Sequence, residues 1–173
     1  MNQVTGIIQC VFNLVIDYTR SPEERITTGG CDEVYNSYYF FEVIRTYSPD
    51  EAKHSMRKCS CAVFCFKQKI TSDEAIKRMA KKGYRPATLL ELLAVSKTKR
   101  GLHRQLSMNV LIALTPFLGH DALGDCVPVI VKHKGTGKNC VPMNAKKKGK
   151  RELSCRALKP GWTKMAHFLA VKK

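Results

Sequence analysis

Residues 61–91 of the chain read CAVFCFKQKITSDEAIKRMAKKGYRPATLLE. They open on a run of branched and aromatic residues of the kind found in strands. Two helix-start signals follow, at Thr71 and at Thr88, in each of which a threonine precedes a glutamate by three residues. The hydroxyl can accept from the free amides of the first turn, and the carboxylate can bond back to the cap. We therefore expect a strand and then two helices, over residues 61–66, 73–82 and 89–97.

The same two patterns recur on both sides of this stretch. Signals of the form Ser-Pro-acid-acid begin at Ser21 and Ser48 and predict helices over residues 22–28 and 49–55. Further strands are expected at residues 11–16, 38–44, 109–114, 127–131, 140–143, 153–157 and 167–171. Pro128 makes its strand an edge or bulged strand, and residues 84–86 are expected to form a turn between helices.

These elements together predict an α+β fold, a single compact domain over residues 1–173 with short capped helices and a mostly antiparallel sheet. The length of 173 residues and the hydrophobic fraction of 44% suit one buried core. Whole-chain disorder, a collagen-like repeat and a coiled coil are excluded.

The first residues carry no basic segment, and Gln9, Asn13 and Asp17 interrupt their apolar run, so we do not expect a signal peptide. No stretch reaches the roughly 18 uninterrupted apolar residues of a membrane-spanning helix. We expect a cytoplasmic protein without membrane contact, in which the eight cysteines are reduced thiols.

Charge is distributed unevenly along the chain. An acidic N-terminal section, residues 1–51, holds 3 basic and 8 acidic residues, whereas the basic section, residues 52–173, holds 27 basic and 6 acidic ones. The net charges are −5 and +21. This asymmetry predicts a basic surface, with the acidic section lying away from it.

The densest part of the basic section is what we call the basic run. It consists of Lys132, Lys134, Lys138, Lys146, Lys147, Lys148, Lys150, Arg151, Arg156, Lys159 and Lys164, against the single acid Glu152. Such a run favours contact with the phosphates of nucleic acid or of a ribonucleoprotein, because each neutralised phosphate releases counterions. It would position a backbone and not specify a sequence. Two smaller groups are Lys77, Arg78, Lys81, Lys82 and Arg85, and Lys97, Lys99, Arg100 and Arg104.

Two other classes of function stay open. The first is a protein–protein inhibitor or regulator, for example a phage-encoded, anti-CRISPR-like antagonist of a nucleic-acid-guided defence nuclease, which would grip an acidic or nucleic-acid-binding groove. The second is an enzyme that uses cysteine, histidine or a bound metal. The chain has no familiar hydrolase, metalloprotease or dinucleotide-binding motif, so no catalytic residue and no cofactor are predicted.

A weak metal candidate is formed by His54, Cys59, Cys61 and Cys65. Zinc sites usually pair their cysteines on knuckle turns two to four residues apart, and this spacing does not fit. On a strand the three cysteines and Val63 would line one face, and Ala62, Phe64 and Phe66 the other. The cysteines are therefore expected to be small core residues rather than ligands.

Two motifs resemble those of a widespread group of small uncharacterised bacterial proteins. Residues 83–93 read GYRPATLLELL, and the chain closes on Trp162 and on FLAVK at 168–172. These match that group's GYRPAT-x-x-ELL helix start and its W…FLAV-[RK]-K terminus. The opening around Val15–Tyr18, Ser21, Glu23 and Glu24 is also similar. The resemblance implies a shared fold and a bacterial or phage origin.

Overall fold

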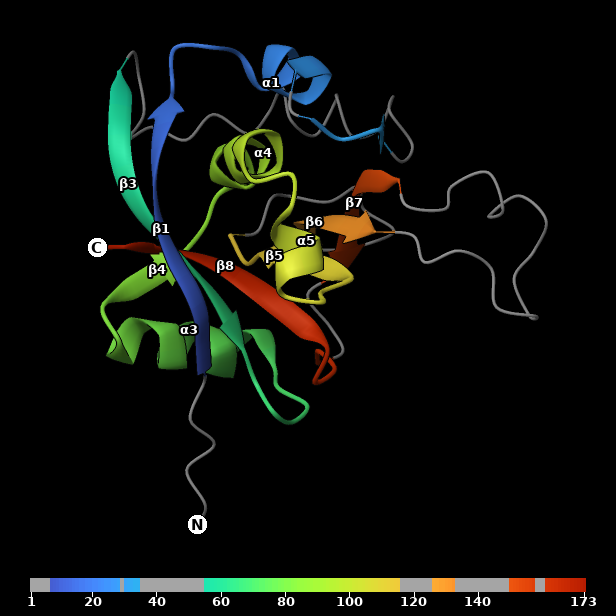
Figure 1. Cartoon of the computed structure of the whole chain (residues 1–173). Helices are drawn as coiled ribbons and strands as arrows, with labels where there is room; N and C mark the ends of the chain where they lie inside the picture. Colours follow the sequence, from blue (N-terminus) through green and yellow to red (C-terminus); the bar gives the residue numbers. More distant parts are fainter. Residues whose placement is uncertain (1–6, 29, 35–54, 116–125, 133–149, 158–160) are drawn as a thin grey trace, which may run out of the picture.

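The computed structural model describes residues 7–28, 30–34, 55–115, 126–132, 150–157 and 161–173 (Figure 1). The strands are β1 (Ile7–Asp17), β2 (Glu33–Val34), β3 (Met56–Cys65), β4 (Tyr84–Pro86), β5 (Val110–Ala113), β6 (Cys126–Lys132), β7 (Arg151–Ala157) and β8 (Ala166–Lys172). The helices are α1 (Pro22–Thr28), α3 (Ser72–Lys81), α4 (Leu89–Thr98) and α5 (Leu102–Gln105). Together they make one compact α+β fold, as the sequence predicts.

The strands form one open sheet in the order β1-β3-β8-β5-β6-β7-β2, and β4 is added beside β8. Two ladders are parallel, β5 with β8 and β2 with β7, and the others are antiparallel. The predicted mostly antiparallel sheet is thus confirmed. β8 is the central strand, because it pairs with β3, β4 and β5.

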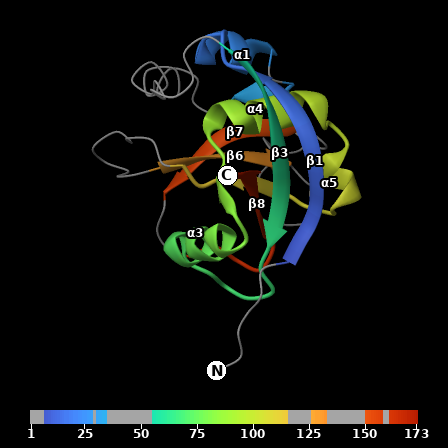
Figure 2. The same ribbon diagram turned by 90° about the vertical axis from the view of Figure 1, so that its left-hand side faces the viewer.

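The two faces of the sheet are packed by different helices. On one face α4 packs Leu89, Leu92 and Leu93 against the strands, and on the other α3 contributes Ala75 and Met79. Figures 1 and 2 show the two helices on opposite sides of the strands. Two buried layers result, so the central strands are apolar on both sides.

The helix-start signals are confirmed wherever the structure describes them. Ser21 Oγ accepts from the Glu24 amide at 3.2 Å, and the Glu24 carboxylate accepts from the Ser21 amide at 3.0 Å. Thr88 and Glu91 exchange the same two bonds. At Thr71 only the hydroxyl bond forms, because the carboxylate of Glu74 pairs with the guanidinium of Arg78.

Two expectations about individual elements are wrong, and two short elements were not predicted. Residues 84–86 form not a turn but the strand β4, whose hydrogen-bonding groups are taken by β8. β6 is an interior strand although it contains Pro128. The pairing of β6 with β5 ends at Val129, one residue before Pro128 is reached. The four-residue helix α5 and the two-residue strand β2 carry too little pattern to be predicted.

Other expectations fall outside the described residues. These are the strands at 38–44 and 140–143 and all but the last residue of the helix at 49–55. Among the described residues, no helix combines the length and the apolar character needed to cross a membrane.

Candidate functional site

The structure describes only part of the basic run. Six of its residues lie outside the described ranges: Lys134, Lys138, Lys146, Lys147, Lys148 and Lys159. The backbones of Lys132 and Arg156 lie in β6 and β7. Lys164 is exposed in the turn before β8, and its carbonyl accepts a 3.6 Å bond from the thiol of Cys65.

Arg151 differs from what its place in the basic run predicts. It is 8% exposed, and its guanidinium donates to the Ser96 carbonyl at 2.8 Å and to the Gly30 carbonyl. Its backbone amide donates to Asp32 Oδ2 at 2.8 Å. Because its donors are directed into the protein, Arg151 holds β7 against α4 and does not present a charge for phosphate.

The acidic section does not lie apart from the basic run. Strand β2 pairs in parallel with β7, with Glu33 opposite Glu152. This places the Glu33 carboxylate 2.8 Å from Lys150 Nζ, while Asp32 lies beside Arg151. The expected separation of the two sections is therefore wrong at this edge of the sheet, where acids of the first section neutralise cations of the second.

Four cations lie at the C-terminal end of α4 and in the turn and short helix that follow. They form what we call the α4-end surface: Lys97, Lys99, Arg100 and Arg104. All four are exposed, and none has an ion-pair partner among the described residues. The partial negative charge of a helix C-terminus stabilises cations in this position. Because Arg151 bonds to Ser96, this surface adjoins the β7 end of the basic run.

A second group of cations lies across the sheet. Here Lys77, Lys81 and Lys82 are exposed on and after α3, and we call them the α3 surface. The residue after β8 lies beside the α3 surface, because the amide of Lys173 donates to the Gly83 carbonyl at 3.0 Å. Arg78 and Arg85, predicted with this group, are engaged instead with Glu74 and Glu91.

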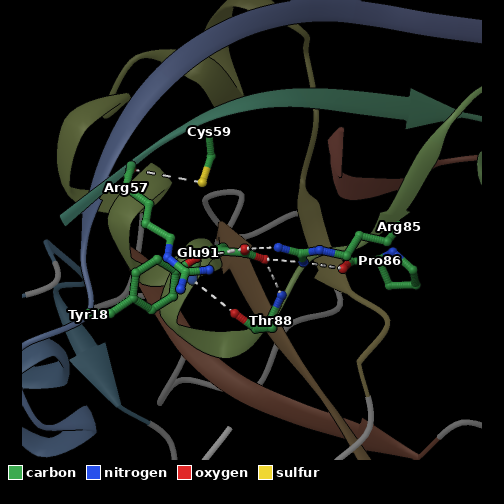
Figure 3. Close-up of polar contacts among 7 residues, drawn as sticks. All are labelled: Tyr18, Arg57, Cys59, Arg85, Pro86, Thr88 and Glu91. Carbon is green, nitrogen blue, oxygen red and sulfur yellow. Dashed lines mark hydrogen bonds and ion pairs between the residues drawn. The ribbon is translucent and has the colours of Figure 1, made fainter. Parts of the chain in front are cut away.

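The carboxylate of Glu91, shown in Figure 3, accepts four hydrogen bonds. Its side chain is fully buried. Oε1 accepts from Tyr18 Oη at 2.9 Å and from Arg85 Nη2 at 2.6 Å, and Oε2 accepts from Arg85 Nη1 at 2.9 Å and from the Thr88 amide at 2.7 Å. Four donors therefore satisfy one carboxylate, in the manner required of a buried charge.

Contact with the Glu91 carboxylate shifts the pKa values of its two side-chain donors. The hydrogen bond to Glu91 and the nearby charge raise the pKa of Arg85. Burial, together with the Glu91 carboxylate, raises the pKa of the Tyr18 hydroxyl. The hydrogen bonds to Glu91 join the residue after β1, strand β4 and the first turn of α4, so the cluster acts as a structural clamp.

The sequence predicted the bond between Glu91 and Thr88 but not the other two partners of Glu91. One available signal was the opposite charge of Arg85 and Glu91 on either side of the Thr88 cap. Arg85 also belongs to the motif at residues 83–93, and Tyr18 to the similar opening segment, of the resemblance described above. The structure brings these distant motifs into direct contact.

The alternation predicted for the cysteines of the metal candidate holds at Cys59 and Cys61, but only Cys61 is buried, and Cys59 and Cys65 are partly exposed. Cys61 is buried with Val63 in the α4 layer, with Cys59 packed against it, whereas Phe64 and Phe66 lie in the α3 layer. Burial raises the pKa of the Cys61 thiol to about 12 and raises that of Cys65. His54 lies outside the described residues. In the described ranges, no three histidine, cysteine or acidic side chains are grouped closely enough to hold a metal.

Comparison of the chain with models of protein families, with curated proteins and with solved structures finds no match.

Proposed function

We propose that this chain is a non-enzymatic protein that binds nucleic acid, free or in a ribonucleoprotein, through the basic run and the adjoining α4-end surface. The observation that carries the proposal is the arrangement of charge. The section from residue 52 onward has a net charge of +21, and the four cations of the α4-end surface are exposed and have no ion-pair partner among the described residues.

The distribution of acids supports the same surface. Asp32, Glu33 and Glu91 are engaged with Arg151, Lys150 and Arg85, so their charges do not oppose the exposed lysines and arginines elsewhere. Exposed cations attract the phosphate backbone regardless of its sequence, since each contact releases a counterion. Binding is therefore expected to depend on charge and salt rather than on base identity.

The first experiment measures fluorescence anisotropy of labelled duplex DNA, single-stranded DNA and hairpin RNA at about 50 and 200 mM salt. With six to ten phosphate contacts, the affinity is expected to fall by about 10³–10⁵-fold over this range. Absence of binding at the lower salt concentration would overturn the proposal. A protein partner would then be the better explanation of the basic surface.

Two matched triple variants test whether the α4-end surface or the α3 surface contacts the nucleic acid. Replacing Lys99, Arg100 and Arg104 together by alanine removes three charges of the α4-end surface, and replacing Lys77, Lys81 and Lys82 removes three from the α3 surface. The first triple variant is expected to reduce the slope of log affinity against log salt by about 2.7, since each contact contributes about 0.9. The second is the control and is expected to change the slope much less. Equal effects would show that only total charge matters.

A further inference from the structure

A cavity of about 220 Å³ lies where β1, α1 and the C-terminal half of α4 meet. Its walls carry three cations, Arg20, Arg25 and Lys97, and one acid, Asp17. Arg20 and Lys97 are exposed, whereas Arg25 is 7% exposed. The cavity therefore has a buried cation within it and two solvent-facing cations at its edge.

The buried cation is incompletely bonded. Arg25 Nε donates to the Arg20 carbonyl at 3.1 Å, and the guanidinium carbon lies 5.7 Å from the centre of the Tyr18 ring. Its Nη2 is buried and has no hydrogen-bond partner. Buried polar groups are nearly always bonded, and a buried charge needs a partner most of all.

The acids nearest to Arg25 are already engaged with other donors. Asp17 Oδ1 accepts from the amide and the hydroxyl of Thr19 at 2.9 and 2.5 Å, and Asp17 Oδ2 lies 3.3 Å from Arg20 Nε. The carboxylate of Glu24 is bonded to the amide of Ser21. Neither acid makes an ion pair with Arg25 in the structure.

We propose that this cavity binds a phosphate group, with Arg25 as the buried ligand and Arg20 and Lys97 as the cations at its edge. Burial without a bonded anion lowers the pKa of Arg25, which is the direction expected when a charge has lost water and gained no partner. A phosphate held in the cavity that Arg25 lines would supply the counter-charge that no ion pair among the described residues supplies. Arginine suits this role because its planar donors match the geometry of phosphate oxygens.

The charge and the size of the cavity specify the ligand further. Three cations and one acid give the walls a net charge of +2, which matches a phosphate dianion better than a monoanionic carboxylate. A volume of about 220 Å³ is below the roughly 300–1,000 Å³ of pockets that enclose drug-sized molecules. The cavity therefore fits free phosphate or the phosphate end of a larger molecule, but not a whole nucleotide.

The test titrates the full chain with inorganic phosphate by calorimetry at constant ionic strength, with chloride as the reference anion. Saturable binding is expected, together with a rise in Tm, because a ligand of the folded state alone stabilises it. Arg25→Gln is expected to weaken binding by about ten-fold or more, the effect of losing a hydrogen bond to a charged group. Lys77→Gln on the α3 surface is the charge-matched control and is expected to bind normally.

Two further variants distinguish a loss of phosphate binding from a folding defect in Arg25→Gln. Lys97→Gln changes an exposed side chain and is expected to weaken phosphate binding without altering Tm in chloride. Arg25→Met is expected to cost stability in phosphate buffer but little in chloride, where its charge has no anion. A titration without saturation, or phosphate binding that survives Arg25→Gln, would overturn the proposal.

Oligonucleotides that differ only in a 5′-phosphate or a 5′-hydroxyl identify the source of the phosphate. A preference for the phosphorylated strand that Arg25→Gln abolishes assigns the cavity to a nucleic-acid end. Equal affinity for the two strands, with inorganic phosphate still bound, assigns it to a small phosphate compound. The calorimetric titration contains no nucleic acid. A failure to bind inorganic phosphate can therefore be distinguished from a failure to bind nucleic acid.

Discussion

The hydroxyl of Tyr18 donates a 2.9 Å hydrogen bond to Oε1 of Glu91, joining the residue after β1 to the first turn of α4 across 73 positions of sequence. The same oxygen accepts from Arg85 at 2.6 Å. Because the Glu91 side chain is fully buried, the clamp is sensitive to loss of either donor.

Arg85→Met is expected to lower the free energy of unfolding by about 3–5 kcal/mol, since it leaves a buried carboxylate without its counter-charge. Tyr18→Phe removes one hydrogen bond to a charged group and is expected to cost about 1.5–3 kcal/mol. Urea denaturation measures both. Arg78→Met, which breaks a pair within one helix, is the control and is expected to cost less than either. An Arg85→Met variant as stable as Arg78→Met would contradict the clamp.

Two neighbouring residues of the basic run are expected to behave oppositely. Arg151→Met removes a buried guanidinium from the carbonyls of Ser96 and Gly30, so it should lower the free energy of unfolding by about 3 kcal/mol or more. Lys150→Ala breaks a partly exposed pair with Glu33 and should cost less than about 1 kcal/mol. Thermal and urea unfolding compare the two, and equal losses would refute the structural role of Arg151.

Cys61 is expected to resist alkylation in the native protein. With the pKa of its thiol raised to about 12 by burial, only about one thiol in ten thousand is ionised at pH 8, and the thiolate is the reactive form. Iodoacetamide labelling followed by peptide mass spectrometry should find Cys61 unmodified in buffer and modified in urea. The partly exposed Cys59 provides the internal comparison. Rapid native labelling of Cys61 would show that the α4 layer opens readily.

Stability is expected to fall in mild acid because of His167. Burial lowers the pKa of this imidazole in the folded state relative to the ordinary value of about 6.5 in the unfolded chain. Below about pH 6.5 the unfolded state therefore binds more protons, and the free energy of unfolding falls as the pH is lowered toward the folded-state pKa. Urea midpoints between pH 7.5 and 5 should fall more steeply for the native chain than for His167→Gln. Parallel slopes would rule out this contribution.

Much of the fold could be predicted because its signals are local. The caps at Ser21 and Thr88 need only three neighbouring residues, and the alternation along β3 is visible in the order of its side chains. β4 was missed because its three residues acquire their strand conformation from β8, which is 88 positions away at the pair of Tyr84 and Lys172. Such pairing leaves no pattern in the short strand itself.

The candidate sites were harder to predict, because charge alone does not reveal burial. Arg151 and Lys150 are adjacent and both basic, yet one is buried and the other exposed. The difference comes from Gly30, whose positive φ of +72° and close approach to α4 place its carbonyl near Arg151. Arg25 likewise stands beside two glutamates in the sequence, and only the packing of α1 on α4 makes it a buried cation.

The central place of β8 has a consequence for how the chain reaches its structure. Its three partners, β3, β4 and β5, all precede it, and the pairing of Cys61 with Val171 spans 110 positions. Closing loops of this length before their contacts form slows folding. We expect β1 with β3, and β6 with β7, to form as early hairpin-like units that remain unconnected until residues 166–172 insert between them. During synthesis, the two halves of the sheet therefore stay separate until β8 has left the ribosome.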